Sequence, residues 1–112
     1  METPRIYEIY AEKLKTYEEA FREFVEVLCK SDKVVEAFLV GSRARGDNLP
    51  YSDYDIVVVV PNNTDKLLVA EELRRLRRKS FPLDLIPIYK DELDDPIYSE
   101  MLRHAKKLCN RE

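Results

Sequence analysis

Two aspartates and a glycine–serine pair are the residues of this chain whose types and spacing could do chemistry. Asp53 and Asp55 are separated by one residue at the start of an apolar run, and Gly41-Ser42 follows an earlier apolar run. On an extended strand, side chains two positions apart lie on one face, with Cα atoms roughly 7 Å apart. Two carboxylates so close repel each other unless a cation lies between them, and an oxygen-only site suits Mg²⁺ or Mn²⁺. The pair therefore predicts a divalent-metal site.

A third carboxylate is expected at Asp84. It interrupts the apolar segment LDLIPIY at residues 83–89, where an isolated charge is costly unless it is compensated. A strand beside Asp53 and Asp55 would bring it to the same metal ions. We therefore predict Asp53, Asp55 and Asp84 as metal ligands, with Asp84 as the best-placed general base.

The glycine–serine pair and the residues after it could bind phosphate. Gly41 allows a close backbone approach to a ligand, and the N–H groups of a following helix, with the Ser42 hydroxyl, could cradle terminal phosphates. Arg43 and Arg45 lie next in the chain, and arginine matches phosphate oxygens in a bidentate way. A helical turn would let only one of the two arginines face the site easily, so both are candidates.

Together these residues predict a two-metal transfer of a nucleotide. One metal, held by all three aspartates, would lower the pKa of an acceptor hydroxyl, and the other, held by Asp53 and Asp55, would grip the triphosphate and the leaving pyrophosphate. Attack would be in line on the α-phosphorus. A capped turn, solvated loop acids and an edge-strand acid would explain each residue singly, but not their joint order along the chain.

The elements that must position this site can be read from periodicity. Residues 5–29 predict one long helix with a single apolar face, made by Ile6, Tyr10, Leu14, Tyr17, Phe21, Phe24 and Leu28. Core packing is the simplest role for this face, and a partner interface is the alternative.

The remainder predicts alternating strands and helices. Strands are expected at 34–40, 55–60 and 83–89, the last near a sheet edge because Pro87 cannot donate to a ladder. Helical segments are expected at 42–47, about 65–79 and 97–108, with an acidic loop at 91–96. The predicted fold class is α/β (α+β): a small mixed sheet of at least three strands flanked by helices, forming a single domain over residues 1–112.

Composition narrows the functional class. The 112 residues are 45% hydrophobic and 37% charged, with a net charge of −3, and an acidic balance argues against general nucleic-acid binding. The N-terminus has no apolar signal region and no apolar run could span a bilayer, so a cytoplasmic protein without membrane association is expected.

Cys29 and Cys109 match no zinc or CxxC spacing; we expect two reduced thiols, with structural pairing as the alternative. His104, the only histidine, is expected to be a surface or half-buried residue.

The segment GSRARGDNLPYSDYDIVVVV at residues 41–60, with LDLIPI at 83–88, resembles the nucleotidyltransferase superfamily of the DNA polymerase beta type, in particular its minimal nucleotidyltransferases. The family pattern of Gly-Ser, ten residues and Asp-x-Asp is met here. The resemblance implies a nucleotidyltransferase fold over about residues 34–109, metal ligation by Asp53, Asp55 and Asp84, and a phosphate cradle at Gly41 and Ser42. It favours Arg43 over Arg45 as the contact to the nucleoside triphosphate.

The same resemblance implies a partner. Minimal family members commonly act beside a small helical HEPN protein, in many cases as an antitoxin that transfers AMP from ATP to a tyrosine of the toxin. Arg103 and His104 are adjacent and do not fit the toxin's Arg-x4–6-His signature, so this chain would be the transferase. Larger relatives have a second lobe for the base and the acceptor. Because this chain has no such lobe, a partner or a second copy is expected to complete the site.

Two other functions stay open from the sequence. The chain could be a binding module that neutralises a partner by occlusion with little or no transfer, although three clustered acids without metal would destabilise a fold. It could also modify a small molecule, as aminoglycoside-modifying relatives do, although the absence of a second lobe speaks against this. Neither the nucleotide choice nor the acceptor can be read from the residues.

Overall fold

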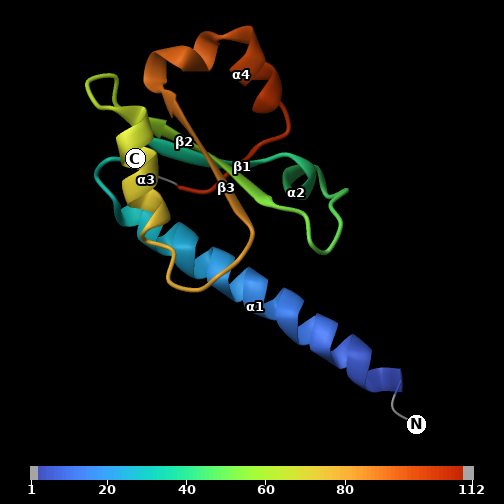
Figure 1. The fold of residues 1–112 in the computed structure, drawn as a ribbon. Coiled ribbons are helices and arrows are strands. Elements are labelled where there is room, and N and C mark those ends of the chain that lie inside the picture. The colour runs from blue at the N-terminus through green and yellow to red at the C-terminus, as the bar shows by residue number, and fades with distance from the viewer. Residues whose placement is uncertain (1–2, 110–112) are drawn as a thin grey trace.

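The computed structural model describes the backbone of residues 3–109 and the side chains of residues 8–9 and 11–109. Long and short helices alternate with the strands of one sheet (Figure 1). In chain order the elements are α1 (Thr3–Lys30), β1 (Glu36–Val40), α2 (Ser42–Arg45), β2 (Tyr54–Val60), α3 (Lys66–Arg74), β3 (Leu83–Tyr89), the 3₁₀ helix η1 (Lys90–Asp94), α4 (Pro96–Met101) and β4 (Lys106–Lys107).

The strands form a four-stranded mixed sheet in the order β3-β2-β1-β4. The β1 strand runs antiparallel to both β2 and β4, whereas β2 and β3 are parallel. This arrangement confirms the predicted mixed α/β fold with helices flanking the sheet. It also places β3 at an edge, which agrees with Pro87 lying in that strand, because proline has no N–H to donate to a further strand.

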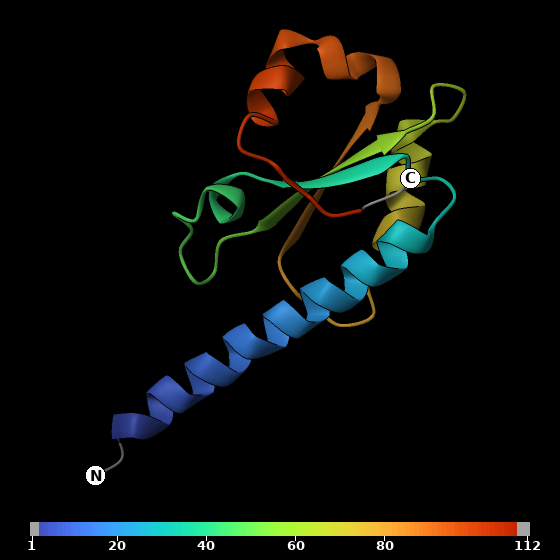
Figure 2. The ribbon, with the colours of Figure 1, turned by 180° about the vertical axis from the view of Figure 1, so that it is seen from behind.

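Helices cover both faces of the sheet, with α1 and α3 on one face and η1 and α4 on the other (Figures 1 and 2). The unbroken apolar run of β2 is buried throughout from Ile56 to Val60, because alternate side chains enter two different cores. Ile56, Val58 and Val60 pack with α1 and α3, and Val57 and Val59 pack beneath α4.

The long helix α1 covers the sheet only with its C-terminal half. Ala20, Phe24 and Leu28 are buried in the core, and Tyr17 and Phe21 are partly buried against it, whereas the N-terminal half projects past the sheet (Figure 2). The side chains of Ile6 and Tyr10, predicted on the same face, lie outside the described residues. Across the described part of the chain, no helix combines the length and apolar character that a membrane span requires.

The helix predicted over about residues 65–79 is shorter than its sequence pattern suggests. The α3 helix ends at Arg74 rather than near 79, because the next residues form tighter turns and the basic side chains leave the helix. Arg77 donates to the Phe81 carbonyl at 2.8 Å, and Arg74 donates to the Leu85 carbonyl at 3.2 Å. These guanidinium groups therefore satisfy backbone acceptors of the loop and of β3.

The predicted helix over 97–108 and the acidic loop over 91–96 are both wrong in part. The acidic segment forms η1, and α4 ends at Met101, after which the chain turns and pairs with β1 as β4. The Leu108 N–H donates to the Ala37 carbonyl at 2.8 Å. The unpaired edge of β1 gives these residues backbone partners, and this tertiary pairing outweighs their helical pattern.

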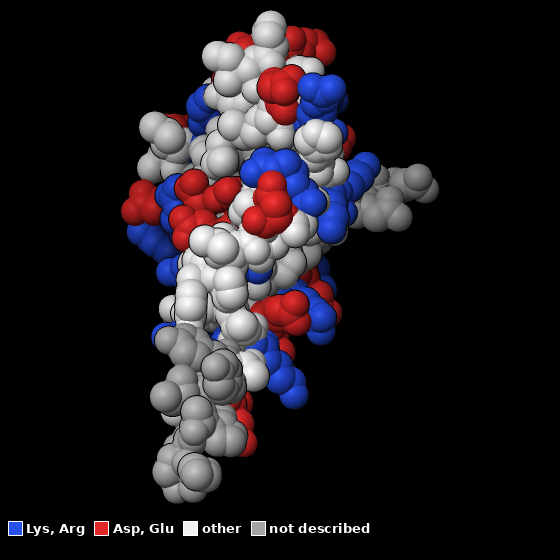
Figure 3. All heavy atoms as spheres, turned by 90° about the vertical axis from the view of Figure 1, so that its right-hand side faces the viewer, with Lys and Arg blue, Asp and Glu red and all other residues white. Residues whose placement is uncertain are grey.

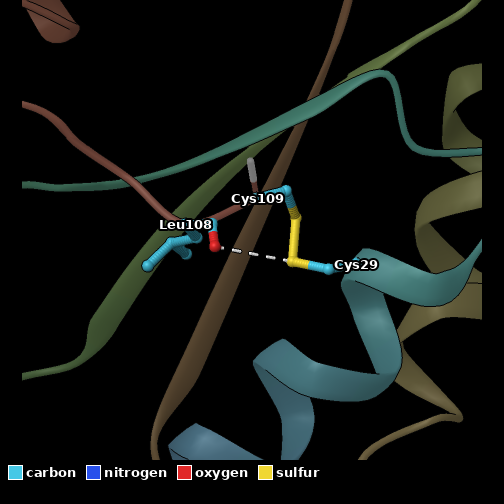
Figure 4. The surroundings of a disulfide bond; sticks show 3 residues. All are labelled: Cys29, Leu108 and Cys109. Carbon is cyan, nitrogen blue, oxygen red and sulfur yellow. Dashed lines mark hydrogen bonds between the residues drawn. A yellow bond between two sulfur atoms is a disulfide. The ribbon is translucent and has the colours of Figure 1, made fainter. Parts of the chain in front are cut away.

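The expectation of two reduced thiols is also wrong. Cys29 at the end of α1 and Cys109 after β4 form a disulfide, and Cys29 Sγ lies 3.6 Å from the Leu108 carbonyl oxygen (Figure 4). The residues are 80 positions apart in the chain. Their pairing depends on β4 running back along β1 toward the end of α1, which the spacing of the cysteines does not reveal.

Candidate active site

The turn after β1 is built around Gly41. Its φ of 73° is in the region that favours glycine, and the Ala44 and Arg45 N–H groups donate to its carbonyl at 3.1 and 3.2 Å. Gly46, with a φ of 86°, ends the single turn of α2. The two glycines therefore hold a compact turn at the point where β1 leaves the sheet.

Asp55 lies directly beside that turn. It is the β2 partner of Val40, the last residue of β1, and a β-carbon placed on Gly41 would lie 2.4 Å from Asp55 Oδ2. No side chain larger than hydrogen fits between the turn and the carboxylate. Glycine at this position thus serves both the backbone conformation and the close approach.

Asp84 is brought next to Asp55 by the parallel pairing of β2 and β3, in which the two residues are direct partners. Both follow the alternation that places Val57, Val59, Ile86 and Ile88 on the α4 face of the sheet. Two carboxylates from different strands therefore lie on one face at the start of both strands. The prediction that Asp84 shares the site with Asp55 agrees with this register.

The two carboxylates affect each other's charge state. Burial raises the pKa of Asp55, and repulsion from Asp84 and then from Asp53 raises it further, whereas Arg45 lowers it. In the described residues, neither Asp55 nor Asp84 forms an ion pair with a basic side chain. Among the described residues, Arg45 is the cation that favours the charged form of Asp55, and it does so without an ion pair.

Asp53 lies just before β2 and is exposed. Its charge reaches Asp55, but it does not line the hollow into which Asp55 and Asp84 face. Among residues 3–109, no three His, Cys, Asp or Glu side chains are arranged to hold one metal ion together. In this conformation, two of the three predicted ligands, Asp55 and Asp84, line the hollow together, and Asp53 lies nearby but outside it.

The hollow at this site has a volume of about 470 Å³, within the range of small-molecule sites. Strand and turn residues form one side and the end of α4 forms the other. The lining residues are Val40, Gly41, Arg45, Asp55, Asp84, Ile86, Glu100, Met101 and His104. The last three were missed as site residues, because a helical pattern at 97–108 does not show that α4 folds back over the carboxylates.

The two arginines of α2 lie in different environments. Arg43 donates from Nε to the Ser52 carbonyl at 2.9 Å and from Nη2 to the Pro50 carbonyl at 3.1 Å, and its guanidinium lies 3.7 Å from the centroid of the Tyr54 ring. Arg45 instead lines the hollow and pairs with Asp47 at 3.2 Å. The structure therefore places Arg45, rather than Arg43, beside the carboxylates.

Tyr54 accounts for the position of Arg43. Its side chain points to the opposite face from Asp55 and is buried in a stack with Phe21 at a centroid distance of 4.7 Å. A second hollow, of about 430 Å³, lies on that side between α1 and the loop after α2, and it contains Arg43 but none of the three aspartates. Ser42 is half-buried, and its side chain makes no capping bond to α2.

On the side of the molecule that carries α2, acidic and basic side chains are interspersed (Figure 3). Within the carboxylate hollow, the lining residues with basic side chains are Arg45 and His104. Phosphate binding in the hollow would therefore depend on these lining groups.

Comparison with known proteins agrees with this geometry. The sequence matches the Nucleotidyltransferase domain family over residues 21–108, a range that includes every residue that lines the carboxylate hollow. The fold is similar to the crystal structure of a candidate nucleotidyltransferase from Sulfolobus solfataricus, with a TM-score of 0.60 and 24% sequence identity over 88% of this chain and 84% of that one. No curated protein matches the sequence.

Proposed function

Because this chain belongs to the nucleotidyltransferase domain family, we propose that it transfers AMP, or another nucleoside monophosphate, from a nucleoside triphosphate to a hydroxyl group of a partner protein. Nucleotidyl transfer is the activity of the family. The metal, the nucleotide and the acceptor are the proposed parts. The observation that supports these proposed parts is the pairing of Asp55 with Asp84 beside Gly41 in one hollow.

Mg²⁺, or alternatively Mn²⁺, fits the donors at this site. Asp55 and Asp84 offer only carboxylate oxygens, which these hard cations prefer, and the raised pKa of Asp55 indicates a need for positive charge at this position. Asp55 and Asp84 would hold the ion, and Asp53, which does not line the hollow in this conformation, would have to turn toward it to become the third ligand. When bound, the ion supplies Lewis acidity toward the phosphate oxygens and the acceptor hydroxyl.

The residues of the chain have separate roles in the proposed reaction. The Gly41 turn, Ser42 and Arg45 hold and orient the triphosphate. The acceptor oxygen forms a bond to the α-phosphorus while the bond from that phosphorus to the bridging oxygen breaks, so that pyrophosphate leaves with the electron pair. The hydroxyl proton passes to a base, for which Asp84 in the lining of the hollow is the candidate.

We further propose that the acceptor is a tyrosine of a helical partner of the HEPN type and that the chain acts as its antitoxin. This part rests on the resemblance of residues 41–60 and 83–88 to minimal nucleotidyltransferases. The projecting half of α1 supports it physically, because it extends past the sheet (Figure 1) and, of its described side chains, only that of Leu14 is partly buried. A second copy of the chain is the alternative partner.

The test is transfer of label from α-labelled ATP in the presence of Mg²⁺, with and without a helical protein of the HEPN type. Asp55→Asn removes one charge from the carboxylate pair, and Asp32→Asn is its matched control, since Asp32 is exposed in the turn after α1. We expect label on the partner with the wild type and Asp32→Asn. With Asp55→Asn we expect it to fall by a factor of about 100 or more, since even outer-sphere changes cost 10–100-fold.

Three outcomes would contradict this function. A stable complex with the partner and no label supports neutralisation by occlusion. Labelling of an aminoglycoside without any protein acceptor supports a small-molecule transferase. Equal labelling by the wild type and Asp55→Asn would remove the carboxylate pair from the reaction.

A further inference from the structure

The end of α4 forms a wall of the hollow opposite the carboxylates. Glu100, Met101 and His104 line it together with Asp55 and Asp84. Met101 and the following Leu102 pack against the sheet in the same cluster as Val57 and Val59. This packing fixes the end of α4 over the start of β2 and β3, and the side chains on its free side face the site.

His104 is the one lining residue on this wall that can donate an N–H. It is exposed and, among the described residues, makes no hydrogen bond or ion pair. Glu100, by contrast, is paired with Arg103 at 3.6 Å on the surface. An imidazole that faces a hollow without a protein partner has its donor available for a ligand.

We propose that His104, with Arg45, binds the triphosphate chain of the nucleotide, an assignment that rests on the proposed function. The lining contains three carboxylates, and these repel phosphate unless a cation intervenes. Arg45 and His104 are the only lining side chains that can carry positive charge. They project from α2 and from the turn after α4, so a phosphate chain in the hollow would be held from both sides.

The carboxylates of the hollow could accept a hydrogen bond from His104, but among the described residues none of them does so, and its N–H can therefore be donated to a phosphate. Val40, Ile86 and Met101 are apolar and offer no hydrogen bond. His104 is exposed, as expected from the sequence, and a contact to the β- and γ-phosphates would make it a substrate-binding residue as well. Its contribution to affinity must then grow with the number of phosphates on the nucleotide.

The experiment compares the affinities of AMP, ADP and α,β-methylene-ATP, whose α–β linkage cannot be cleaved, for the wild type, His104→Ala and Lys106→Ala at fixed Mg²⁺. Lys106 is exposed on β4 and does not line the hollow, so Lys106→Ala controls for the loss of one nearby cation. We expect His104→Ala to weaken the triphosphate analogue by about tenfold, as for one charge-assisted hydrogen bond. AMP should be nearly unaffected, and His104→Lys should restore most of the loss.

The outcomes separate this inference from the function on which it rests. If the wild type binds the triphosphate analogue and His104→Ala binds it equally well, the inference is overturned while the proposed function stands. An equal loss for AMP and the triphosphate also overturns it, since the histidine would then act on the nucleoside. If the wild type binds none of the nucleotides, the proposed function fails and the assignment of His104 fails with it.

Discussion

Gly41 and Asp55 are in such close contact that a single added methyl group would collide with the carboxylate: a β-carbon on Gly41 would lie 2.4 Å from Asp55 Oδ2. The contact joins the turn that is proposed to bind phosphate to one of the carboxylates that are proposed to bind metal. Any displacement of one therefore displaces the other.

Gly41→Ala is accordingly predicted to damage both stability and activity. The backbone of Gly41, with φ 73° and ψ −156°, lies in a region restricted almost entirely to glycine, which costs about 1–3 kcal/mol for a residue with a β-carbon, and the collision must in addition move Asp55. Displacements of about 1 Å in an active site can cost 10²-fold in rate. Urea denaturation and the labelling reaction measure the two effects.

Gly46→Ala is the matched control for this variant. Gly46 also has a positive φ, but with φ 86° and ψ 6° it lies in the left-handed α region, where a β-carbon costs about 1–2 kcal/mol, and a β-carbon there would meet no atom within 4 Å. We expect the strain to lower the stability of Gly46→Ala while its activity stays close to that of the wild type. Equal activity losses in the two variants would show that the contact with Asp55 is unimportant.

The pKa of Asp55 predicts a pH-dependent stability in the absence of metal. Burial and the neighbouring Asp84 and Asp53 raise this pKa in the folded state, so the folded protein binds the proton more tightly than the unfolded chain. The contribution of Asp55 to the free energy of unfolding is thus largest below its ordinary pKa of 3.8 and is lost as the pH rises through the raised value. At pH 7 the ionised carboxylate is a net cost to the fold.

Asp55→Asn tests this directly, because the amide has nearly the same shape and no charge. Without metal at pH 7, the variant should have a higher melting temperature than the wild type, and the difference should shrink as the pH falls toward 4. Added Mg²⁺ should raise the melting temperature of the wild type more than that of Asp55→Asn. A variant less stable than the wild type at pH 7 would argue against repulsion at this position.

The parts of the site that the sequence could predict are those fixed by local order. Gly41 after a strand, and Asp55 at the start of the next, become neighbours because adjacent antiparallel strands pair. Asp84 joins them through the parallel register of β2 and β3, and because it is exposed there, its charge did not need a compensating partner. Apolar runs likewise predicted the bounds of β3 without error and those of β2 to within one residue.

The parts that could not be predicted depend on tertiary contacts. The pattern at 97–108 is helical, yet pairing with β1 converts its end to β4 and brings Cys109 to Cys29. His104 lines the hollow with the carboxylates because α4 ends early and the chain turns there toward β4. Similarly, a one-turn helix does not reveal which arginine faces the site, because the burial of Tyr54 on the other face decides where Arg43 lies.

The different environments of Arg43 and Arg45 predict different defects. Arg43→Ala removes two hydrogen bonds to backbone carbonyls and the contact with Tyr54, so it should lower the free energy of unfolding by about 1–2 kcal/mol. Arg43→Lys should rescue little of this loss, since lysine lacks the planar fork.

Arg45→Ala should have the converse effect. Its ion pair with Asp47 is exposed and such pairs contribute little to stability, whereas the loss of a cation from the hollow should weaken triphosphate binding by about tenfold. Denaturant unfolding and nucleotide titration on the two variants measure both quantities. If Arg43→Ala abolished nucleotide binding in a protein of unchanged stability, the resemblance-based preference for Arg43 would be restored.

The disulfide predicts that the stability of the protein depends on its redox environment. It closes a loop over 80 positions of the chain between the end of α1 and the residue after β4, and the chain-entropy relation gives a loss of about 4 kcal/mol when such a loop is opened. Urea unfolding with and without a thiol reductant should show this loss in the wild type. The Cys29→Ser, Cys109→Ser double variant should match the reduced wild type and be insensitive to reductant. An unchanged midpoint on reduction of the wild type would show that the β4 pairing holds the C-terminal segment without the covalent bond.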